Sequence, residues 1–376
     1  MKKTKRGWKI AGIISGALLL LIVAAILILP KVLFTDYEGL PTTGEYGVKQ
    51  TAAILIDESR VETFEKDGSK REVPVYFFYP EVKAGEGDKK EFPLVLFSHG
   101  AFGYYQSNMS TYMELASRGY VVVSLDHPYH SFFTKDTDGK TITVNSQFMS
   151  EVMEINGENI GENEIIQMSR SWLDIRVADM GFALDSIKTA NQKGQTAKET
   201  WFVTGEDARE EIEYVLGMTD VEKIGLMGHS LGGAASVTLG RTREDIDAVI
   251  DLDGTMIGEE FGYENGVYAL YRESYPVPLL AFSNEEHHFE REKFGSMYVN
   301  NVVLENAKDA SYTYIEGSGH MNFTDLPLFS PPLASMLGVG DVDPKECVLS
   351  MNRTILKYYD YYLKNKGDRA EWCLNY

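Results

Sequence analysis

The sequence predicts an α/β fold, in which a mostly parallel central sheet is covered by helices on both faces. Short apolar runs at 93–98 and 121–125 are continuous rather than alternating, as in strands that are buried on both faces. Longer amphipathic runs, such as 166–190, lie between the predicted strands. Strands that alternate with helices form a largely parallel sheet, because each connection crosses back over one face.

The expected elements follow the chain in order. A hairpin comes first, with strands at 61–65 and 73–79, because Asp67-Gly68 between them is typical of a tight turn. A helix over 107–118 comes next and ends before a glycine. The later predicted strands are 223–227, 248–252, 279–282 and 312–315, and the later helices are 166–190, 206–216, one after Ser230, one near 289–300 and 348–363.

Composition divides the chain into four segments: a basic segment 1–9, an apolar segment 10–30, a stalk 31–50 and one domain over 51–376. Glycine, proline and threonine in the stalk are typical of a linker. Within the domain, residues 131–165 are polar and lack a regular apolar period, which predicts an irregular insertion.

The apolar segment is expected to anchor the protein in a membrane. Residues 10–29 form a run of 20 uncharged residues, and a helix of that length spans about 30 Å, the thickness of a hydrocarbon core. Six basic residues and no acidic residue lie within 1–34, which predicts a cytoplasmic N-terminus and a domain outside the cytoplasm. A cleaved signal peptide has a shorter apolar run and a small-residue cleavage site, so we expect a single-pass cell-membrane protein.

The net charge bears on the expected partners, and the cysteine content bears on a possible disulfide. The 36 basic and 56 acidic residues give a net charge of −20, whereas nucleic-acid binding needs a basic surface, so no nucleic-acid partner is expected. The two cysteines, Cys347 and Cys373, leave two alternatives open: a disulfide formed outside the cytoplasm, or two buried thiols. The sequence leaves the oligomeric state open.

One motif has the context that gives it chemical meaning. Gly228-His229-Ser230-Leu231-Gly232 is a G-x-S-x-G pattern between a predicted buried strand and an alanine-rich helix. A tight strand-to-helix turn would raise the serine above the edge of the sheet, at a helix N-terminus that favours an oxyanion. The motif therefore predicts Ser230 as a nucleophile.

A nucleophilic serine needs a base, and the base needs an acid that orients it. In this type of site the chain order is serine, acid, histidine. Three histidines follow Ser230, and His320 lies in a glycine-flanked loop directly past the last predicted strand. His287 and His288 lie in a charged stretch that resembles the start of a helix. The position past the strand favours His320 as the base.

Topology alone leaves the acid open. Asp253 follows the strand after the serine helix, and Glu285 and Glu286 follow the next strand. The oxyanion hole is expected to use two main-chain N–H groups, that of Leu231 after the nucleophile and that of Ala101 in the glycine-rich loop after residues 93–98. The adjacent acids and histidines near 285–288 lack a spaced partner, so neither a metal nor a cofactor is expected.

Six segments follow one another along the chain: PLVLFSHGAFGYY, ELASRGYVVVSLDHPYHS, IGLMGHSLGGAAS, VIDLDGTM, PLLAFSNE and GSGHMNF. Taken together and in this order, they resemble the α/β-hydrolase superfamily and, more closely, the plasma platelet-activating-factor acetylhydrolase family over about residues 73–325. The resemblance implies an α/β-hydrolase fold, with Ser230 as nucleophile, His320 as base and Ala101 and Leu231 as oxyanion donors. It also favours Asp253 as the acid, because the family places its acid in an L-D-x-x-M context.

The resemblance implies a serine hydrolase of short-acyl carboxylic esters, acetyl phospholipids among them, and the predicted anchor would attach it to the membrane. Its partners would be a small ester or lipid substrate and the membrane. Dienelactone-hydrolase-like, polyester-cleaving, peptidase or acyltransferase activity is the alternative within the enzymes. A non-catalytic surface protein on a hydrolase scaffold is the alternative outside them.

Overall fold

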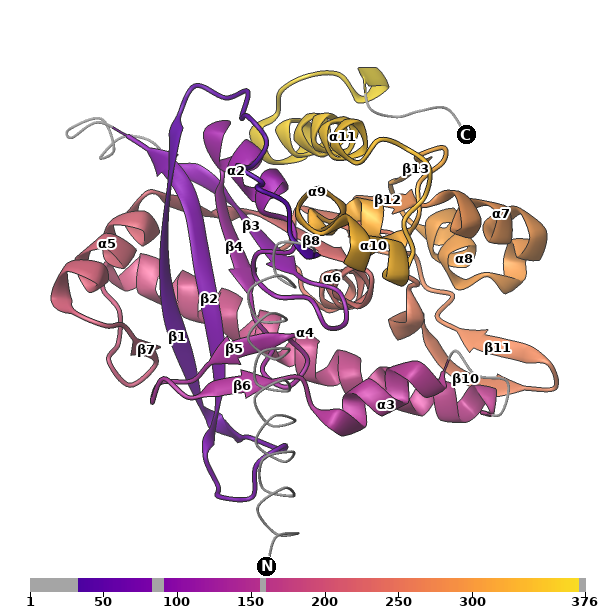
Figure 1. Ribbon diagram of the computed structural model, residues 1–376, viewed down its shortest axis with the longest axis horizontal. Coiled ribbons are helices and arrows are strands. Elements are labelled where there is room, and N and C mark those ends of the chain that lie inside the picture. Colours follow the sequence, from indigo (N-terminus) through magenta and orange to yellow (C-terminus); the bar gives the residue numbers. More distant parts are fainter. Residues whose placement is uncertain (1–32, 83–90, 156–159, 372–376) are drawn as a thin grey trace, which may run out of the picture.

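A nine-stranded sheet forms the centre of the computed structural model, which describes residues 33–82, 91–155 and 160–371 (Figure 1). Its strands are β1 (Gly47–Val61), β2 (Lys70–Glu81), β3 (Phe92–Ser98), β4 (Val121–Leu125), β7 (Trp201–Phe202), β8 (Thr219–His229), β9 (Ala248–Leu252), β12 (Leu279–Ser283) and β13 (Ala310–Tyr314). The strand order is β13-β12-β9-β8-β3-β4-β2-β1-β7. Strands from β13 to β4 pair in parallel, and β2, β1 and β7 add antiparallel pairs. The predicted mostly parallel sheet is thus confirmed.

Helices cover both faces of this sheet (Figure 1). The α-helices of the described residues are α2 (Met109–Ser117), α3 (Ser146–Glu154), α4 (Glu162–Lys193), α5 (Glu206–Gly217), α6 (Leu231–Thr242), α7 (Glu285–Phe294), α8 (Val299–Asn306), α9 (Leu326–Phe329), α10 (Pro331–Leu337) and α11 (Pro344–Lys364). Leu94 and Leu96 of β3 belong to the core shared with α4, α5 and α6, whereas Val95 and Phe97 belong to the core shared with α2 and α11. Because alternate side chains enter different cores, the strand has to be apolar throughout.

The expected hairpin is present, but its first strand was placed too late. β1 ends at Val61 and pairs antiparallel with β2, and residues 62–69 form the connection. Gly68 has φ 80°, so Asp67-Gly68 does lie in the turn. The first strand lies earlier because the alternation of buried Ala53 and Leu55 with more exposed neighbours already supplies a sheet face.

The expected stalk is not a free linker over its described part. The Thr35 N–H donates to Phe329 at 2.8 Å, and the Tyr37 and Ser110 hydroxyls are 2.8 Å apart. The Thr43 N–H donates to Glu114 at 2.7 Å, and β1 has begun by residue 47. Residues 33–46 thus form hydrogen bonds with side chains and main-chain groups of α2 and α9, and they lie along the domain.

Residues 131–165 are more regular than predicted. They contain the hairpin β5 (Phe133–Lys135) and β6 (Thr141–Thr143), then α3, and they reach the first turn of α4. Asn145 caps α3 by accepting hydrogen bonds from two main-chain N–H groups, and Phe148 of α3 is buried against His130 and Trp172. Elements this short give too few periods for a pattern to be recognised in the sequence.

Some predictions concern residues that the structure does not describe. The basic segment 1–9 and the anchor 10–30 lie outside the described residues. No helix within the described ranges is long and apolar enough to cross a bilayer. Cys347 is buried in α11, and Cys373 lies outside the described residues.

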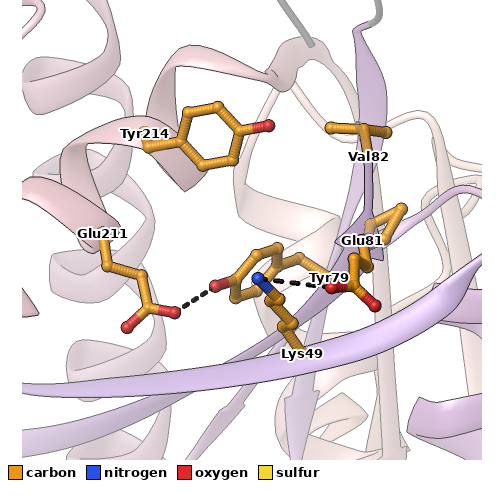
Figure 2. A pocket seen from close by; sticks show the side chains of 7 residues that line it. Lys49, Tyr79, Glu81, Val82, Glu211 and Tyr214 are labelled. Atoms are coloured by element: carbon orange, nitrogen blue, oxygen red, sulfur yellow. Dashed lines mark hydrogen bonds and ion pairs between the residues drawn. The ribbon is translucent and has the colours of Figure 1, made fainter. Parts of the chain in front are cut away.

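A small pocket opens toward the antiparallel edge of the sheet, between β1, β2 and α5 (Figure 2). Its lining consists of Lys49, Tyr79, Pro80, Glu81, Val82, Glu211 and Tyr214. The Tyr79 hydroxyl donates to Glu211, and Lys49 pairs with Glu81 at 3.4 Å. These four polar side chains are thus paired with one another, and β2, β4 and β3 separate β1 from β8, the strand before Ser230.

Candidate active site

A single residue, Ser230, separates β8 from α6. Its backbone has φ 54° and ψ −124°, a strained conformation for a residue other than glycine. Glycines make so tight a turn sterically feasible: a Cβ at Gly228 would lie 2.2 Å from the Gly232 main chain, and one at Gly232 would lie 2.0 Å from the Ser98 carbonyl oxygen. The turn places Ser230 at the carboxyl end of the sheet and the N-terminus of α6.

Asp253 directly follows β9, and its carboxylate is surrounded by hydrogen-bond donors. The main-chain N–H and the side-chain amide of Asn284 donate at 2.7 and 2.8 Å. Nδ1 of His287 lies 2.8 Å from Oδ1, and Nδ1 of His320 lies 2.6 Å from Oδ2. Burial alone would raise the pKa of Asp253, but hydrogen bonds from His287 and His320 outweigh burial and lower this pKa to about 2. The carboxylate is therefore ionised at neutral pH.

His320 begins a 3₁₀ helix, His320–Phe323, in the loop after β13. Its carbonyl oxygen accepts a hydrogen bond from Nε2 of His229 at 3.1 Å, and the two rings are 4.6 Å apart. Because His229 precedes Ser230, the imidazole of His320 lies beside the serine turn. Nδ1 of His320 is bound to Asp253, which leaves Nε2 for chemistry. Among the described residues, the Ser230 hydroxyl has no hydrogen-bond partner.

The loop after β3 lies against the serine turn. A Cβ at Gly100 would lie 2.8 Å from Nδ1 of His229 and 3.2 Å from Cβ of Ser230, so only glycine allows this approach. The next residue is Ala101, whose N–H has no acceptor within the described parts of the chain. Leu231 is the first residue of α6, where helix N–H groups lack partners within the helix. Two N–H donors are thus available beside the serine.

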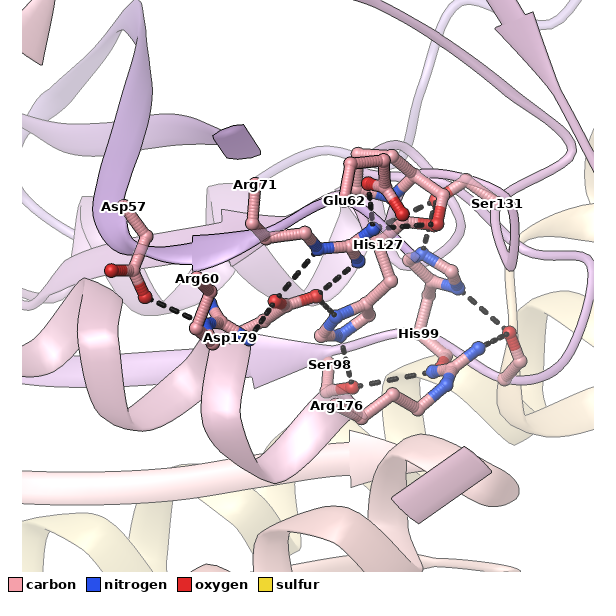
Figure 3. Close-up of polar contacts among 12 residues, drawn as sticks. Asp57, Arg60, Glu62, Arg71, Ser98, His99, His127, Ser131, Arg176 and Asp179 are labelled. Carbon is pink, nitrogen blue, oxygen red and sulfur yellow. Dashed lines mark hydrogen bonds and ion pairs between the residues drawn. The ribbon is translucent and has the colours of Figure 1, made fainter. Parts of the chain in front are cut away.

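A buried arginine forms hydrogen bonds with the loop after β3 (Figure 3). Arg176 of α4 donates to the carbonyl oxygens of His99 and, at 3.3 Å, Gly100. In a trans peptide the C=O and the following N–H point in opposite directions, so the bond to the Gly100 carbonyl turns the Ala101 N–H away from Arg176. Burial lowers the pKa of Arg176 to about 9, and the guanidinium stays charged at neutral pH.

Next to Arg176 lies a second serine–histidine–aspartate arrangement (Figure 3). The Ser98 hydroxyl is 2.9 Å from Nε2 of His127, and Nδ1 of His127 is 3.0 Å from Asp179, which also pairs with Arg71 at 2.6 Å. All these side chains are buried, so a substrate has no access to them. This network was not predicted from the sequence. The one sequence pattern that points to it is the three-residue spacing of Arg176 and Asp179, which puts both side chains on one face of a helix.

Most of the chain matches a known protein family. The family model described as "Platelet-activating factor acetylhydrolase, isoform II" matches residues 77–375. The chain belongs to this family.

Curated relatives carry related names. The platelet-activating factor acetylhydrolases of Canis lupus familiaris and Bos taurus are each 23% identical, over 75% of this chain and 60% of theirs. The chain thus spans about three-fifths of their length. A probable 1-alkyl-2-acetylglycerophosphocholine esterase of Arthroderma benhamiae is 27% identical over 46% of this chain and 34% of its own.

A solved structure has the same fold. The ferulic acid esterase from Streptomyces cinnamoneus superposes with a TM-score of 0.61 and 19% identity, over 88% of this chain and 94% of its own. At that identity the likeness bears on the fold alone, and it supports an α/β-hydrolase architecture for this acetylhydrolase-family chain.

The alternative acids and bases have other partners in this family member. Glu285 accepts a hydrogen bond from the Gly317 N–H at 3.1 Å, and no contact joins Glu285 or Glu286 to His320. Nδ1 of His288 is 3.0 Å from the Tyr312 hydroxyl. Of the three candidate acids, only Asp253 is bonded to His320.

One group of side chains has the composition of a metal site. Among the described residues, the donor atoms of Asp253, His287 and His320 lie within 4.8 Å of one another. Each of these atoms is already in a hydrogen bond between a histidine and the carboxylate. Hydrogen bonding accounts for their proximity, so the arrangement needs no metal to explain it.

Proposed function

We propose that this chain is a serine hydrolase of carboxylic esters. The observation that carries the proposal is the 2.6 Å hydrogen bond between His320 and Asp253 beside the strained turn of Ser230. The buried carboxylate fixes the tautomer of His320 with the proton on Nδ1, so Nε2 is left to accept a proton. The acetylhydrolase and esterase names of the relatives support the same reaction class.

Each residue has one task in the proposed mechanism. The Ser230 hydroxyl attacks the ester carbonyl while Nε2 of His320 takes its proton, and Asp253 stabilises the imidazolium. The N–H groups of Ala101 and Leu231 bind the oxyanion of the tetrahedral intermediate. The intermediate expels the alcohol, which takes the proton from His320 and leaves an acyl-serine. Water then repeats the sequence and releases the acid.

Exposed apolar side chains flank the proposed site and indicate an amphipathic substrate. Met336 and Leu337, which are 80% and 58% exposed, end α10 next to Gly338, whose carbonyl accepts from the main chain after His320. Phe132 is 60% exposed, and its N–H donates to the loop that carries the oxyanion donor. We propose short-acyl esters with a lipid part, acetyl phospholipids among them, as the substrate class. The net charge of −20 favours neutral or zwitterionic esters over anionic ones.

A substrate screen tests this proposal. The purified protein is assayed with p-nitrophenyl esters of increasing acyl length and with an acetyl phospholipid. We expect kcat/KM to be highest for the short acyl groups and the acetyl phospholipid to be cleaved. No hydrolysis of any ester would contradict the proposed function, and a preference for long chains would contradict the substrate class.

Replacing Arg176 with lysine is expected to lower kcat about 10- to 100-fold with a smaller change in KM, since one oxyanion donor contributes about 10²- to 10³-fold. A lysine keeps the charge, but its single nitrogen lacks the planar fork that presents separate N–H groups to the two carbonyl oxygens. Arg209→Lys is the matched control, because Arg209 holds Thr196 and the Trp201 carbonyl near α5. A folded Arg176→Lys variant with kcat within twofold of Arg209→Lys would contradict the role given to Arg176.

We also propose that residues 10–30 anchor the domain on the outer side of the cell membrane. The support is their uncharged composition and the basic segment before them. Protease added to intact cells is expected to digest the domain, because it would lie outside the bilayer. Digestion only after lysis would place the domain in the cytoplasm and contradict the proposed topology.

A further inference from the structure

Asp253 binds two imidazoles rather than one. Nδ1 of His287 lies 2.8 Å from Oδ1, and Nδ1 of His320 lies 2.6 Å from Oδ2. His287 is in the first turn of α7, where its main-chain N–H donates to the capping side chain of Asn284 at 2.7 Å. Since Asn284 also donates twice to Asp253, this turn supplies three hydrogen bonds to the carboxylate.

The surroundings of His287 favour its charged form. Burial lowers the pKa of His287, but the hydrogen bond and the charge of Asp253, with those of Glu290 and Glu286, outweigh burial and raise this pKa. The other titratable groups that face it are His320, whose ring centre is 6.1 Å away, and His229, which burial keeps neutral. His287 therefore takes up a positive charge more readily than a free imidazole does.

We propose that His287 is a positioning residue that shares the Asp253 carboxylate with His320 and so sets the pH range in which His320 acts as a base. The inference rests on the proposed function. A positive charge on His287 cancels part of the negative charge that would stabilise a proton on His320. With His287 present, we expect the enzyme to stay active to lower pH. The bond from His287 also stops the carboxylate from rotating away from His320.

Two substitutions separate the charge from the hydrogen bond. His287→Asn keeps a donor close to the position of Nδ1 but removes the charge, and His287→Ala removes both. We expect the midpoint of the acid limb of kcat/KM to rise in both variants, by about 0.5 to 1 pH unit, the size expected for two charges about 6 Å apart near water. Above the limb, kcat should fall about tenfold in His287→Ala and stay within threefold in His287→Asn, because only the latter holds the carboxylate.

His288→Asn is the matched control, because His288 neighbours His287 in α7 but contacts Tyr312 and Tyr314 instead of Asp253. Its acid limb should coincide with that of the wild type. If the acid limbs of both His287 variants coincide with it as well, the inference is wrong although the enzyme is active. If His287→Ala does not fold, the limb of His287→Asn decides alone. If the wild type hydrolyses no ester at all, the proposed function fails, and this inference with it.

Discussion

Ser230→Ala is expected to abolish ester hydrolysis, with a loss of about 10⁶-fold in kcat, as is typical when the nucleophile of such a triad is removed. The hydroxyl is the only group at the strained turn that can form an acyl intermediate, and the remaining oxyanion donors give a modest acceleration over water. The fold should be retained, because the change removes one partly exposed oxygen that has no hydrogen-bond partner among the described residues.

The measurement is kcat for short p-nitrophenyl esters, with circular dichroism and thermal unfolding as controls for the fold. The protein has to be free of host esterase, since a trace would exceed the residual rate. Hydrolysis by Ser230→Ala within tenfold of the wild type would show that another nucleophile acts.

Asp253→Asn is expected to lower kcat about 10⁴-fold, because an amide neither stabilises the imidazolium nor enforces the right tautomer of the histidine. An asparagine here would also turn N–H groups toward donors, since both oxygens of Asp253 accept hydrogen bonds from the side chains of His287, His320 and Asn284. Loss of stability is therefore expected beside loss of activity.

Glu285→Gln and Glu286→Gln are the matched controls for Asp253→Asn. Both carboxylates follow β12, one strand along the sheet from Asp253, and neither contacts His320. Their kcat/KM should stay within about threefold of the wild type, as is usual for surface changes that break no catalytic contact. A larger loss in either than in Asp253→Asn would place the acid after β12.

The parallel part of the sheet was predictable because its strands contain short runs of apolar residues. β4 and β9 have the predicted bounds, and β8, β12 and β13 differ only at their ends. β4, β9 and β12 are buried along their whole length, so their sequences are mostly apolar. The weaker elements were missed or misplaced. The hairpin β10 (Glu260–Glu264) and β11 (Val267–Leu270) is short and only partly buried, and the predicted helix near 289–300 is in fact two helices, α7 and α8.

The candidate site was predictable where it depends on strand ends. Ser230, Asp253 and His320 each follow a parallel strand, and parallel strands bring their carboxyl ends to one edge. The hydrogen-bond partners of these side chains could not be predicted from strand ends. His287 and His288 are adjacent, and their side chains point in different directions from α7. His287 contacts Asp253 and His288 contacts Tyr312, and this choice depends on the residue at which α7 begins.

The buried network around Arg176 was beyond sequence reasoning for another reason. Its side chains come from β2, β3, β4 and α4 and their loops, and they meet only because the sheet and α4 are packed together. A buried charged residue does not show in the hydrophobic periodicity of a sequence, and the periodicity of α4 is that of an ordinary amphipathic helix. The network nevertheless determines the direction of the Ala101 N–H in this account.

The most direct test of the account is to find which residue a fluorophosphonate modifies. The wild-type protein is labelled, digested and mapped by tandem mass spectrometry, with Ser230→Ala treated in parallel. Among the described residues, Ser98 and Ser131 are buried and hydrogen-bonded to His127 and His99, whereas Ser230 is partly exposed at the turn beside His320, and the three serines fall on different peptides. The account predicts one adduct, on Ser230, and no adduct in Ser230→Ala. An adduct on Ser98 or another residue, or ester hydrolysis that continues without any adduct, would contradict it.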